Sequence, residues 1–129
     1  MRLILPRPLA SKIIGGLRED EEVCGFLLGL EGEDFRVLDV VFARNELHSP
    51  TSFRINPREV LEILERAERR GLQLVGIFHS HLRCPPIPSP DDLRGMKLWN
   101  VPWLITDGRE MRAWILKDGK VVEVELSFE

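Results

Sequence analysis

Four polar side chains near the middle of the chain have the types and the spacing of a metal site. His79 and His81 stand two positions apart at the end of an apolar run, and a strand projects such residues to the same face. Ser89 and Asp92 follow at a predicted helix start. Two imidazoles and one carboxylate can bind a metal ion and leave a fourth tetrahedral position open to water, as in catalytic zinc sites.

The same residues also have structural explanations. For an isolated His-x-His the more common one is a pair of hydrogen-bonded histidines near a strand end. Serine before a proline and an acid is a good helix N-terminus, in which the cap at Ser89 is worth about 1 kcal/mol. Cys84 is a rival third ligand, although Pro85 and Pro86 limit its reach. The residue types alone leave both a metal site and a structural arrangement open.

The elements that would position these residues form an α/β pattern. Val75 and Ile77 are expected on the same strand face as His79 and His81. Three prolines in the segment 84–88 exclude both an α-helix and a hydrogen-bonded β-strand. A stiff loop must therefore connect the histidine strand to the next helix. Apolar runs predict a mixed sheet of roughly six strands and three helices: strands 23–30, 35–43, 73–81, 103–106, 111–116 and 121–126, and helices 6–16, 57–70 and 90–100. Asp107-Gly108 and Asp118-Gly119 mark turns between the last strands.

Length and composition exclude several classes of protein. The 129 residues suit one domain, 1–129, and 43% hydrophobic with 30% charged residues is typical of a globular protein. A net charge of −3 argues against a nucleic-acid-binding surface. The first apolar residues are too few for a signal peptide, and no run is long enough to span a membrane. Two cysteines are too few for a fold that depends on a framework of disulfide bonds. We expect a cytoplasmic protein, and a homodimer is left open.

Other residues of interest have mainly structural explanations. Cys24 and the tryptophans Trp99 and Trp103 are expected in the core, and His48 is expected to be a loop residue rather than a ligand. Whether Cys24 and Cys84 are free, bonded or redox-active is left open. Phe53 lies in a loop without periodicity, where it could line a substrate groove or pack into the core.

The spacing His79-x-His81-x7-Ser89-x2-Asp92 resembles the signature of the JAMM (MPN-plus) metalloprotease family. That family also has an upstream glutamate, often in a Glu-x-Cys-Gly context, and this chain reads Glu22-Val23-Cys24-Gly25. The order of the predicted elements is similar over essentially the whole chain. Leu82 stands where many members have proline, and the long insertions by which some eukaryotic members grip ubiquitin chains are absent. With no such insertions, the chain resembles the small stand-alone prokaryotic members.

The resemblance implies a role for each residue of the signature. His79, His81 and Asp92 would bind Zn²⁺, and Ser89 would hydrogen-bond the developing oxyanion. Glu22 would be the general base, because the spacing to Cys24 favours it over its neighbour Glu21. Without the resemblance, either glutamate would be interpreted as a solvated loop acid.

The resemblance also implies a substrate class. The expected activity is hydrolysis of the amide bond after the C-terminal glycine tail of a ubiquitin-like protein, with the tail laid along a strand edge. A lysine side chain as the amine would make the protein an isopeptidase, similar to a deubiquitinase. The alternative is a peptidase that frees cysteine or another amino acid from a sulfur-carrier protein. Rivals of other kinds are a metal-free MPN-type binding module and a purely structural zinc site.

Overall fold

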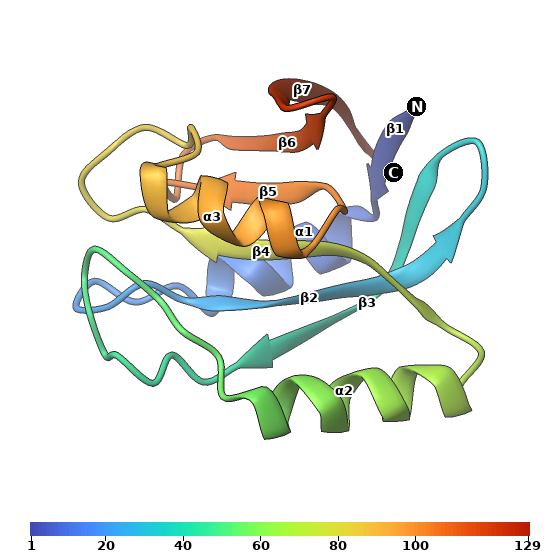
Figure 1. Cartoon of the computed structure of the whole chain (residues 1–129), viewed down its shortest axis with the longest axis horizontal. Helices are drawn as coiled ribbons and strands as arrows, with labels where there is room; N and C mark the ends of the chain where they lie inside the picture. Colours follow the sequence, from blue (N-terminus) through green and yellow to red (C-terminus); the bar gives the residue numbers. More distant parts are fainter.

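Seven strands form one curved mixed sheet in the computed structural model, which describes residues 1–129 (Figure 1). The strands lie side by side in the order β1-β3-β2-β4-β5-β6-β7, and β7 returns to β1, so that the sheet closes into a barrel. The parallel pair β4 and β5 is joined by a crossover that contains α3, as parallel pairs require. The elements in chain order are β1 (Arg2–Leu5), α1 (Arg7–Gly15), β2 (Cys24–Glu31), β3 (Phe35–Ala43), α2 (Pro57–Arg69), β4 (Gln73–Ser80), α3 (Pro90–Leu98), β5 (Trp103–Thr106), β6 (Met111–Lys117) and β7 (Lys120–Phe128).

The N-terminal strand β1 is the element that the sequence-based prediction of about six strands misses. Leu3, Ile4 and Leu5 are fully buried, and β1 pairs in parallel with both β3 and β7. The strand has only four residues before Pro6 ends it, and so short a run carries no periodicity that identifies a strand. The α/β class and the three predicted helices are confirmed.

Helices cover both faces of the sheet. α1 packs through Ile13 on the core cluster of one face, whereas α2 and α3 pack through Ile63 and Met96 on the cluster of the opposite face. Both β4 and α3 therefore border the second cluster, and their ends can meet on that side of the sheet (Figure 1). None of the helices combines the length and the hydropathy that a membrane crossing requires.

A β-bulge in β4 changes which residues share a face with the histidines. The pairing of β2 with β4 skips Val75, which is an extra residue in β4. Val75 consequently joins the core beneath α1, while Ile77 packs towards α2 and α3 with the histidines. The prediction that Val75 lies on the face of His79 is therefore wrong, because strict alternation fails at the bulge.

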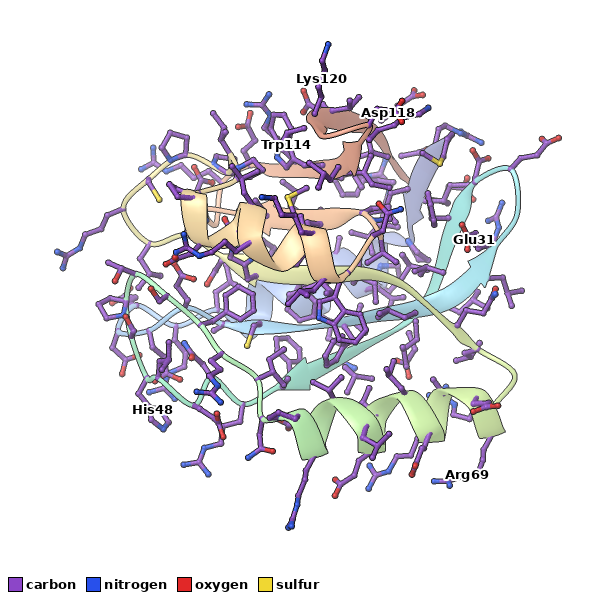
Figure 2. The ribbon with its side chains drawn as sticks, viewed as in Figure 1. Glu31, His48, Arg69, Trp114, Asp118 and Lys120 are labelled. Atoms are coloured by element: carbon purple, nitrogen blue, oxygen red, sulfur yellow. The ribbon has the colours of Figure 1, made fainter.

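The predicted turn at Asp118-Gly119 is confirmed. Lys117 pairs with Lys120, so Asp118 and Gly119 alone connect β6 to β7. Both have positive φ, 51° at Asp118 and 77° at Gly119, as a type I′ turn requires. Asp118 and Lys120 lie together at this end of the molecule (Figure 2).

A methyl group at Gly25 is expected to destabilise the sheet next to the histidines. A Cβ at this position would lie against the Val41 carbonyl oxygen and the Phe78 ring. Gly25→Ala must therefore separate β2 from β3 or displace Phe78, and overpacking of this kind costs about 1–3 kcal/mol. Denaturant unfolding measures the change. Gly15→Ala is the control, since its Cβ meets no atom within 4 Å and alanine favours the helix. Equal stability of the two variants would contradict the expectation.

Candidate metal and catalytic site

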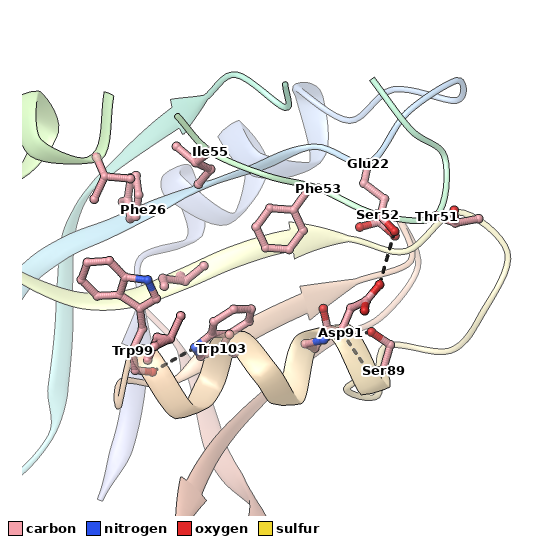
Figure 3. Close-up of a pocket in the computed structure, with 15 residues that line it drawn as sticks. Glu22, Phe26, Thr51, Ser52, Phe53, Ile55, Ser89, Asp91, Trp99 and Trp103 are labelled. Atoms are coloured by element: carbon pink, nitrogen blue, oxygen red, sulfur yellow. Dashed lines mark hydrogen bonds between the residues drawn. The ribbon is translucent and has the colours of Figure 1, made fainter. Parts of the chain in front are cut away.

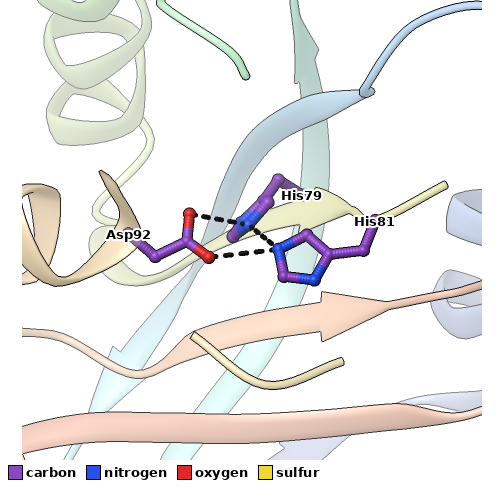
Figure 4. A group of neighbouring side chains, drawn as sticks. All are labelled: His79, His81 and Asp92. Atoms are coloured by element: carbon purple, nitrogen blue, oxygen red, sulfur yellow. Dashed lines mark hydrogen bonds and ion pairs between the residues drawn. The ribbon is translucent and has the colours of Figure 1, made fainter. Parts of the chain in front are cut away.

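Three buried side chains converge where the end of β4 meets the N-terminus of α3 (Figure 4). The Nε2 atoms of His79 and His81 are 3.1 Å apart, and they lie 3.0 and 3.1 Å from the two carboxylate oxygens of Asp92. No side chain of the three is more than 5% exposed. The structure thus brings together the three residues that the sequence predicts as metal ligands.

The hydrogen bonds of His81 fit a cation at the centre of this group. His81 Nδ1 donates to the Pro85 carbonyl oxygen at 2.8 Å, which leaves Nε2 directed at Asp92. In neutral His81 this Nε2 carries a lone pair, and a lone pair facing a carboxylate oxygen needs a proton or a metal ion between them. Two imidazole nitrogens and a carboxylate are also a donor set of catalytic zinc sites, so these residues fit Zn²⁺.

His79 is held in place by aromatic rings instead of a second hydrogen bond. Its Nδ1 is buried and has no hydrogen-bond partner. The Phe53 ring lies 4.7 Å and the Trp103 ring 5.8 Å from the imidazole, measured between centroids. Contact with these two rings, which also contact each other, therefore restricts the direction of Nε2. Phe53, which the sequence left between core and groove, contacts the candidate site directly.

Burial opposes the charged form of each group, and the contacts decide the balance. At Asp92 burial opposes ionisation, but the hydrogen bonds from His79 and His81 outweigh it and hold the pKa far below its usual range. At His81 burial disfavours the imidazolium, yet the hydrogen bonds to Asp92 and Pro85 raise the pKa. At His79 burial dominates and lowers the pKa. A proton held by this group therefore resides on His81 rather than His79.

The response of stability to pH is expected to differ with and without zinc. In zinc-free protein the Asp92–His81 pair stabilises fully between about pH 3.8 and 6.5, where the unfolded chain has both groups charged. This contribution is lost as the pH rises through the raised pKa of His81 or falls through the lowered pKa of Asp92. Zinc must displace the proton, so stabilisation by zinc should grow from about pH 5 to about pH 8. Thermal unfolding with zinc and with a chelator tests this; equal zinc stabilisation at both pH values would contradict it.

The pairing of β2 with β4 places Glu22 beside the same group. Cys24 lies opposite His79 in this antiparallel pair. Glu22 precedes Cys24 by two positions and His81 follows His79 by two, so Glu22 reaches the face of the histidines next to His81. Two hydrogen bonds between Val23 and Ser80, beyond the last paired residues of the two strands, keep these segments in register there.

The two neighbouring glutamates have different surroundings. Glu22 is 4% exposed, and burial raises the pKa of its carboxyl to about 7, an effect that His81 opposes and Asp92 reinforces. Glu21 instead pairs with His48 Nδ1 at 3.0 Å. His48 lies at the outer edge of the loop before α2 (Figure 2). A group with a pKa near 7 can take up and release protons at neutral pH, so Glu22 is the glutamate suited to acid–base chemistry.

Ser89 is the N-cap of α3 and orients Asp92. Its Oγ accepts a hydrogen bond from the Asp92 backbone N–H at 3.1 Å, and its own N–H donates to Asp92 Oδ2 at 2.9 Å. This capping box turns the carboxylate towards the histidines. Ser89 Oγ only accepts, so its proton is free to point into the adjacent groove.

A narrow groove of about 190 Å³ adjoins the candidate ligands (Figure 3). Its walls are the loop before α2 and helix α3, and Ser52 Oγ lies 3.4 Å from the Asp91 carboxylate across its polar end. The volume is below the roughly 300–1,000 Å³ of pockets for compact ligands, so a slender chain suits it better. The lining residues are Glu22, Thr51, Ser52, Ser89, Asp91 and Asp92 at the polar end and chiefly Phe26, Phe53, Ile55, Val60, Ile77, Leu98, Trp99 and Trp103 elsewhere.

The remaining candidates take structural positions. Cys24 is buried, and burial raises the pKa of its thiol to about 12, as expected of a core residue. Cys84 is exposed and stands outside the converging donors, and both cysteines are free thiols. Trp103 is buried as predicted, whereas Trp99 is only partly buried, and both rings line the groove. Asn45, which contacts the main chain of Glu22, has no signal in the sequence that distinguishes it from other turn asparagines.

Comparison with known families agrees with this geometry. The model of the family described as prokaryotic homologs of the JAB domain matches residues 6–117, which include every candidate residue of the site. The chain belongs to this family. This JAB-family protein is accordingly a hydrolase of the metalloprotease class, as the resemblance to the JAMM signature implied.

Relatives of this JAB-family protein carry the names of peptidases. A desampylase from Pyrococcus furiosus is 48% identical over 130 residues, which cover 98% of this chain and 91% of the relative. The CysO-cysteine peptidase of Mycobacterium tuberculosis is 27% identical over 94% of this chain and 87% of its own. The solution structure of a protein from Desulfitobacterium hafniense has the same fold, with a TM-score of 0.85 and 27% identity over 98% of this chain and 92% of that one.

Proposed function

We propose that this protein is a zinc-dependent peptidase that cleaves the amide bond after the C-terminal glycine tail of a ubiquitin-like protein, including an isopeptide bond to lysine. The observation that carries the proposal is the convergence of His79, His81 and Asp92, with Glu22 and Asp92 lining the polar end of the adjoining groove. The extensive similarity to the desampylase supports a substrate of this class. The cytoplasmic location and the possible homodimer come from the sequence alone and remain predictions.

The loop segment 52–55 offers an edge for an extended tail. Arg54 turns its N–H and carbonyl inward, to Asn45 Oδ1 at 3.2 Å and to the N–H of Glu46 at 2.9 Å. The backbone groups of the flanking residues Phe53 and Ile55 have no hydrogen-bond partner in the protein, while their side chains line the groove (Figure 3). Unpaired backbone groups of this kind accept an added strand, and glycines in that strand would suit so narrow a groove.

The chain's own residues would supply the proton transfers. When bound, zinc lowers the pKa of a water molecule towards about 7 and polarises the scissile carbonyl. Glu22, whose pKa is about 7, would take a proton from the attacking water and pass it to the leaving amine. The free hydroxyl proton of Ser89 would hydrogen-bond the oxyanion. His79, His81 and Asp92 would hold the metal.

The donor count favours a catalytic site over a structural one. Only three side chains converge, and Asp92 lines the groove. A structural zinc site would close the fourth position with a protein ligand, and it would have no use for a buried glutamate with a raised pKa beside it. Three protein donors beside a groove that Asp92 and Glu22 line would leave room for water and substrate at the metal, which supports hydrolysis.

Ser89→Ala is expected to lower kcat by about 100- to 1,000-fold with little change in KM, because the hydroxyl proton would contact the substrate only at the developing oxyanion. Loss of the cap should also lower the free energy of unfolding by about 1 kcal/mol. Asn56→Ala is the control, since Asn56 caps α2 by the same type of bond and lies outside the site. Kinetics of Ser89→Ala that match those of Asn56→Ala would remove Ser89 from the mechanism.

A second candidate function rests on the similarity to the CysO-cysteine peptidase. In that case the protein would release an amino acid such as cysteine from the C-terminus of a sulfur carrier. Both reactions need the same zinc site and the same tail, and they differ only in the amine that leaves.

The decisive assay offers one glycine-tailed ubiquitin-like protein in three forms: linked to lysine by an isopeptide bond, fused linearly to a reporter, and ending in an added cysteine. Faster cleavage of the isopeptide supports the proposal, whereas faster release of cysteine supports the second candidate. Zinc-loaded protein that cleaves none of the three above the rate of Glu22→Gln would contradict both.

A further inference from the structure

Asn45 is a buried residue whose side-chain amide makes four hydrogen bonds, and it is 3% exposed. Nδ2 donates to the carbonyl oxygens of Glu22 and Ser52, both at 3.0 Å. Oδ1 accepts from the backbone N–H groups of Leu47 and Arg54 at 3.1 and 3.2 Å. An amide has two N–H donors and one oxygen with two lone pairs, so the full capacity of Asn45 is used.

The partners also determine which way the amide points. All four are backbone groups, of which two can only accept and two can only donate. Aspartate has the same shape, but its second oxygen would face the carbonyl oxygens of Glu22 and Ser52. No residue of similar size other than asparagine satisfies this position.

The four bonds join the proposed base to the proposed substrate edge. Residues 44–56 contain no helix or strand, and long loops of this kind are commonly functional. Within this loop Asn45 binds both ends of the segment 52–54, and its other donor bond holds the main chain of Glu22. A further bond, from the Glu22 N–H to Ser49 at 2.8 Å, attaches the same loop to the base.

We infer that Asn45 is a positioning residue, which holds the tail-binding edge 52–55 and the main chain of Glu22 at a constant separation. The inference rests on the proposed function, because the edge and the base act on one substrate. The tail and the attacking water must meet within a fraction of an ångström, so a loop free to shift would misplace the scissile bond relative to Glu22. His79, His81 and Asp92 make no hydrogen bond to Asn45, so metal binding should not depend on it.

The test compares Asn45→Ala and Asn45→Asp with Asn56→Ala. Asn56 is the matched control, because it lies in the same loop and makes side-chain bonds to Glu46 and Arg58 but none to Glu22 or to the edge. Three quantities are measured on each protein: zinc content, kcat and KM on the isopeptide conjugate, and the affinity for the released ubiquitin-like product. Trp99 and Trp103 line the groove, so their fluorescence reports product binding.

Asn45→Ala is expected to weaken product binding about tenfold and to lower kcat/KM about 100-fold at unchanged zinc content. Asn45→Asp keeps the acceptor for Leu47 and Arg54 but loses both donor bonds, to Glu22 and to Ser52, and turns an oxygen towards their carbonyl oxygens. Its kcat/KM should therefore fall at least as far as that of Asn45→Ala, also at unchanged zinc content. Kinetics and product binding of Asn45→Ala equal to those of Asn56→Ala would overturn the inference. A loss of activity that only follows a loss of zinc would overturn it as well.

Amide hydrogen exchange separates a failure of this inference from a failure of the proposed function. In Asn45→Ala the amides of Leu47 and Arg54 should exchange about tenfold faster than in the wild type, while sheet amides such as that of Leu27 keep their rates. If the wild type cleaves no conjugate, the proposed function fails. Exchange at wild-type rates in Asn45→Ala would then still overturn the role of Asn45, and faster exchange confined to the loop would support it.

Discussion

Glu22→Gln is expected to lower kcat by about 100- to 10,000-fold, the contribution of a general base, while the protein remains folded and zinc-loaded. Glutamine has the shape of glutamate but cannot accept the proton of the attacking water. Glu22 is not one of the converging metal donors, so zinc binding should survive. Rates on the isopeptide conjugate and metal analysis of the same sample measure the two quantities.

The pH dependence provides a second test of Glu22. Only the ionised carboxylate can act as the base, so kcat/KM of the wild type should rise with pH through the pKa of Glu22. Burial places that pKa at about 7, and a bound dication would lower it. In Glu22→Gln this rising limb should disappear. Because the raised pKa makes the ionised form costly, zinc-free Glu22→Gln should also be more stable than the wild type above pH 7 and not below pH 4.5.

Glu21→Gln is the control for this experiment. Glu21 has the same chemistry one position earlier, but it pairs with His48 at the surface. It should keep activity within about twofold, as surface substitutions usually do. Full activity in Glu22→Gln, or an equal loss in Glu21→Gln, would refute the assignment of the base.

Asp92→Asn should weaken zinc binding by at least about 100-fold. This exceeds the usual effect of changing a residue that only hydrogen-bonds a metal ligand. Asparagine keeps the size of the side chain but removes the negative charge, and it can turn an N–H₂ group towards the histidines. Two imidazoles alone then remain to hold the metal. Activity should fall with zinc content and should recover in part when zinc is supplied in excess. Competition with a chromogenic chelator gives the affinity.

Asp91→Asn tests whether negative charge near the site, without a ligand atom, contributes to zinc binding. Asp91 also lies in the first turn of α3, but it is exposed, and it pairs with Arg94. This variant should therefore keep its zinc. If both variants lost zinc equally, the effect would come from the charge of the α3 N-terminus rather than from a ligand.

Local signals explain how much of the fold could be predicted from the sequence. The Asp118-Gly119 turn and the Ser89 cap depend on residues within a few positions of one another, and both are confirmed. Strand β1 and the bulge at Val75 depend on partners far away in the chain. Neither leaves a pattern in its own segment, which is why the strand was missed and the face of Val75 was wrong.

The candidate site likewise contains residues that the sequence could predict and one that it could not. The converging ligands could be predicted because a family signature records the spacing at which a strand end and a helix start meet. The choice between Glu21 and Glu22 rested on that resemblance, and the structure adds the physical reason, since the register of β2 on β4 buries only Glu22 beside His81. Asn45 could not be predicted, because its importance comes from four backbone groups that only the folded loop assembles.

The pairing of β2 with β4 also has a consequence for when the enzyme can become active. The bond between the Val23 N–H and Ser80 Oγ joins residues 57 positions apart, and closing so long a loop costs conformational entropy that slows folding. The predicted ligand Asp92 comes later still in the sequence. A nascent or partly unfolded chain would therefore hold the proposed base and the predicted ligands apart, and it would lack the assembled site that zinc binding and cleavage require. Zinc occupancy would then report the fraction of molecules in which β2, β4 and α3 have come together.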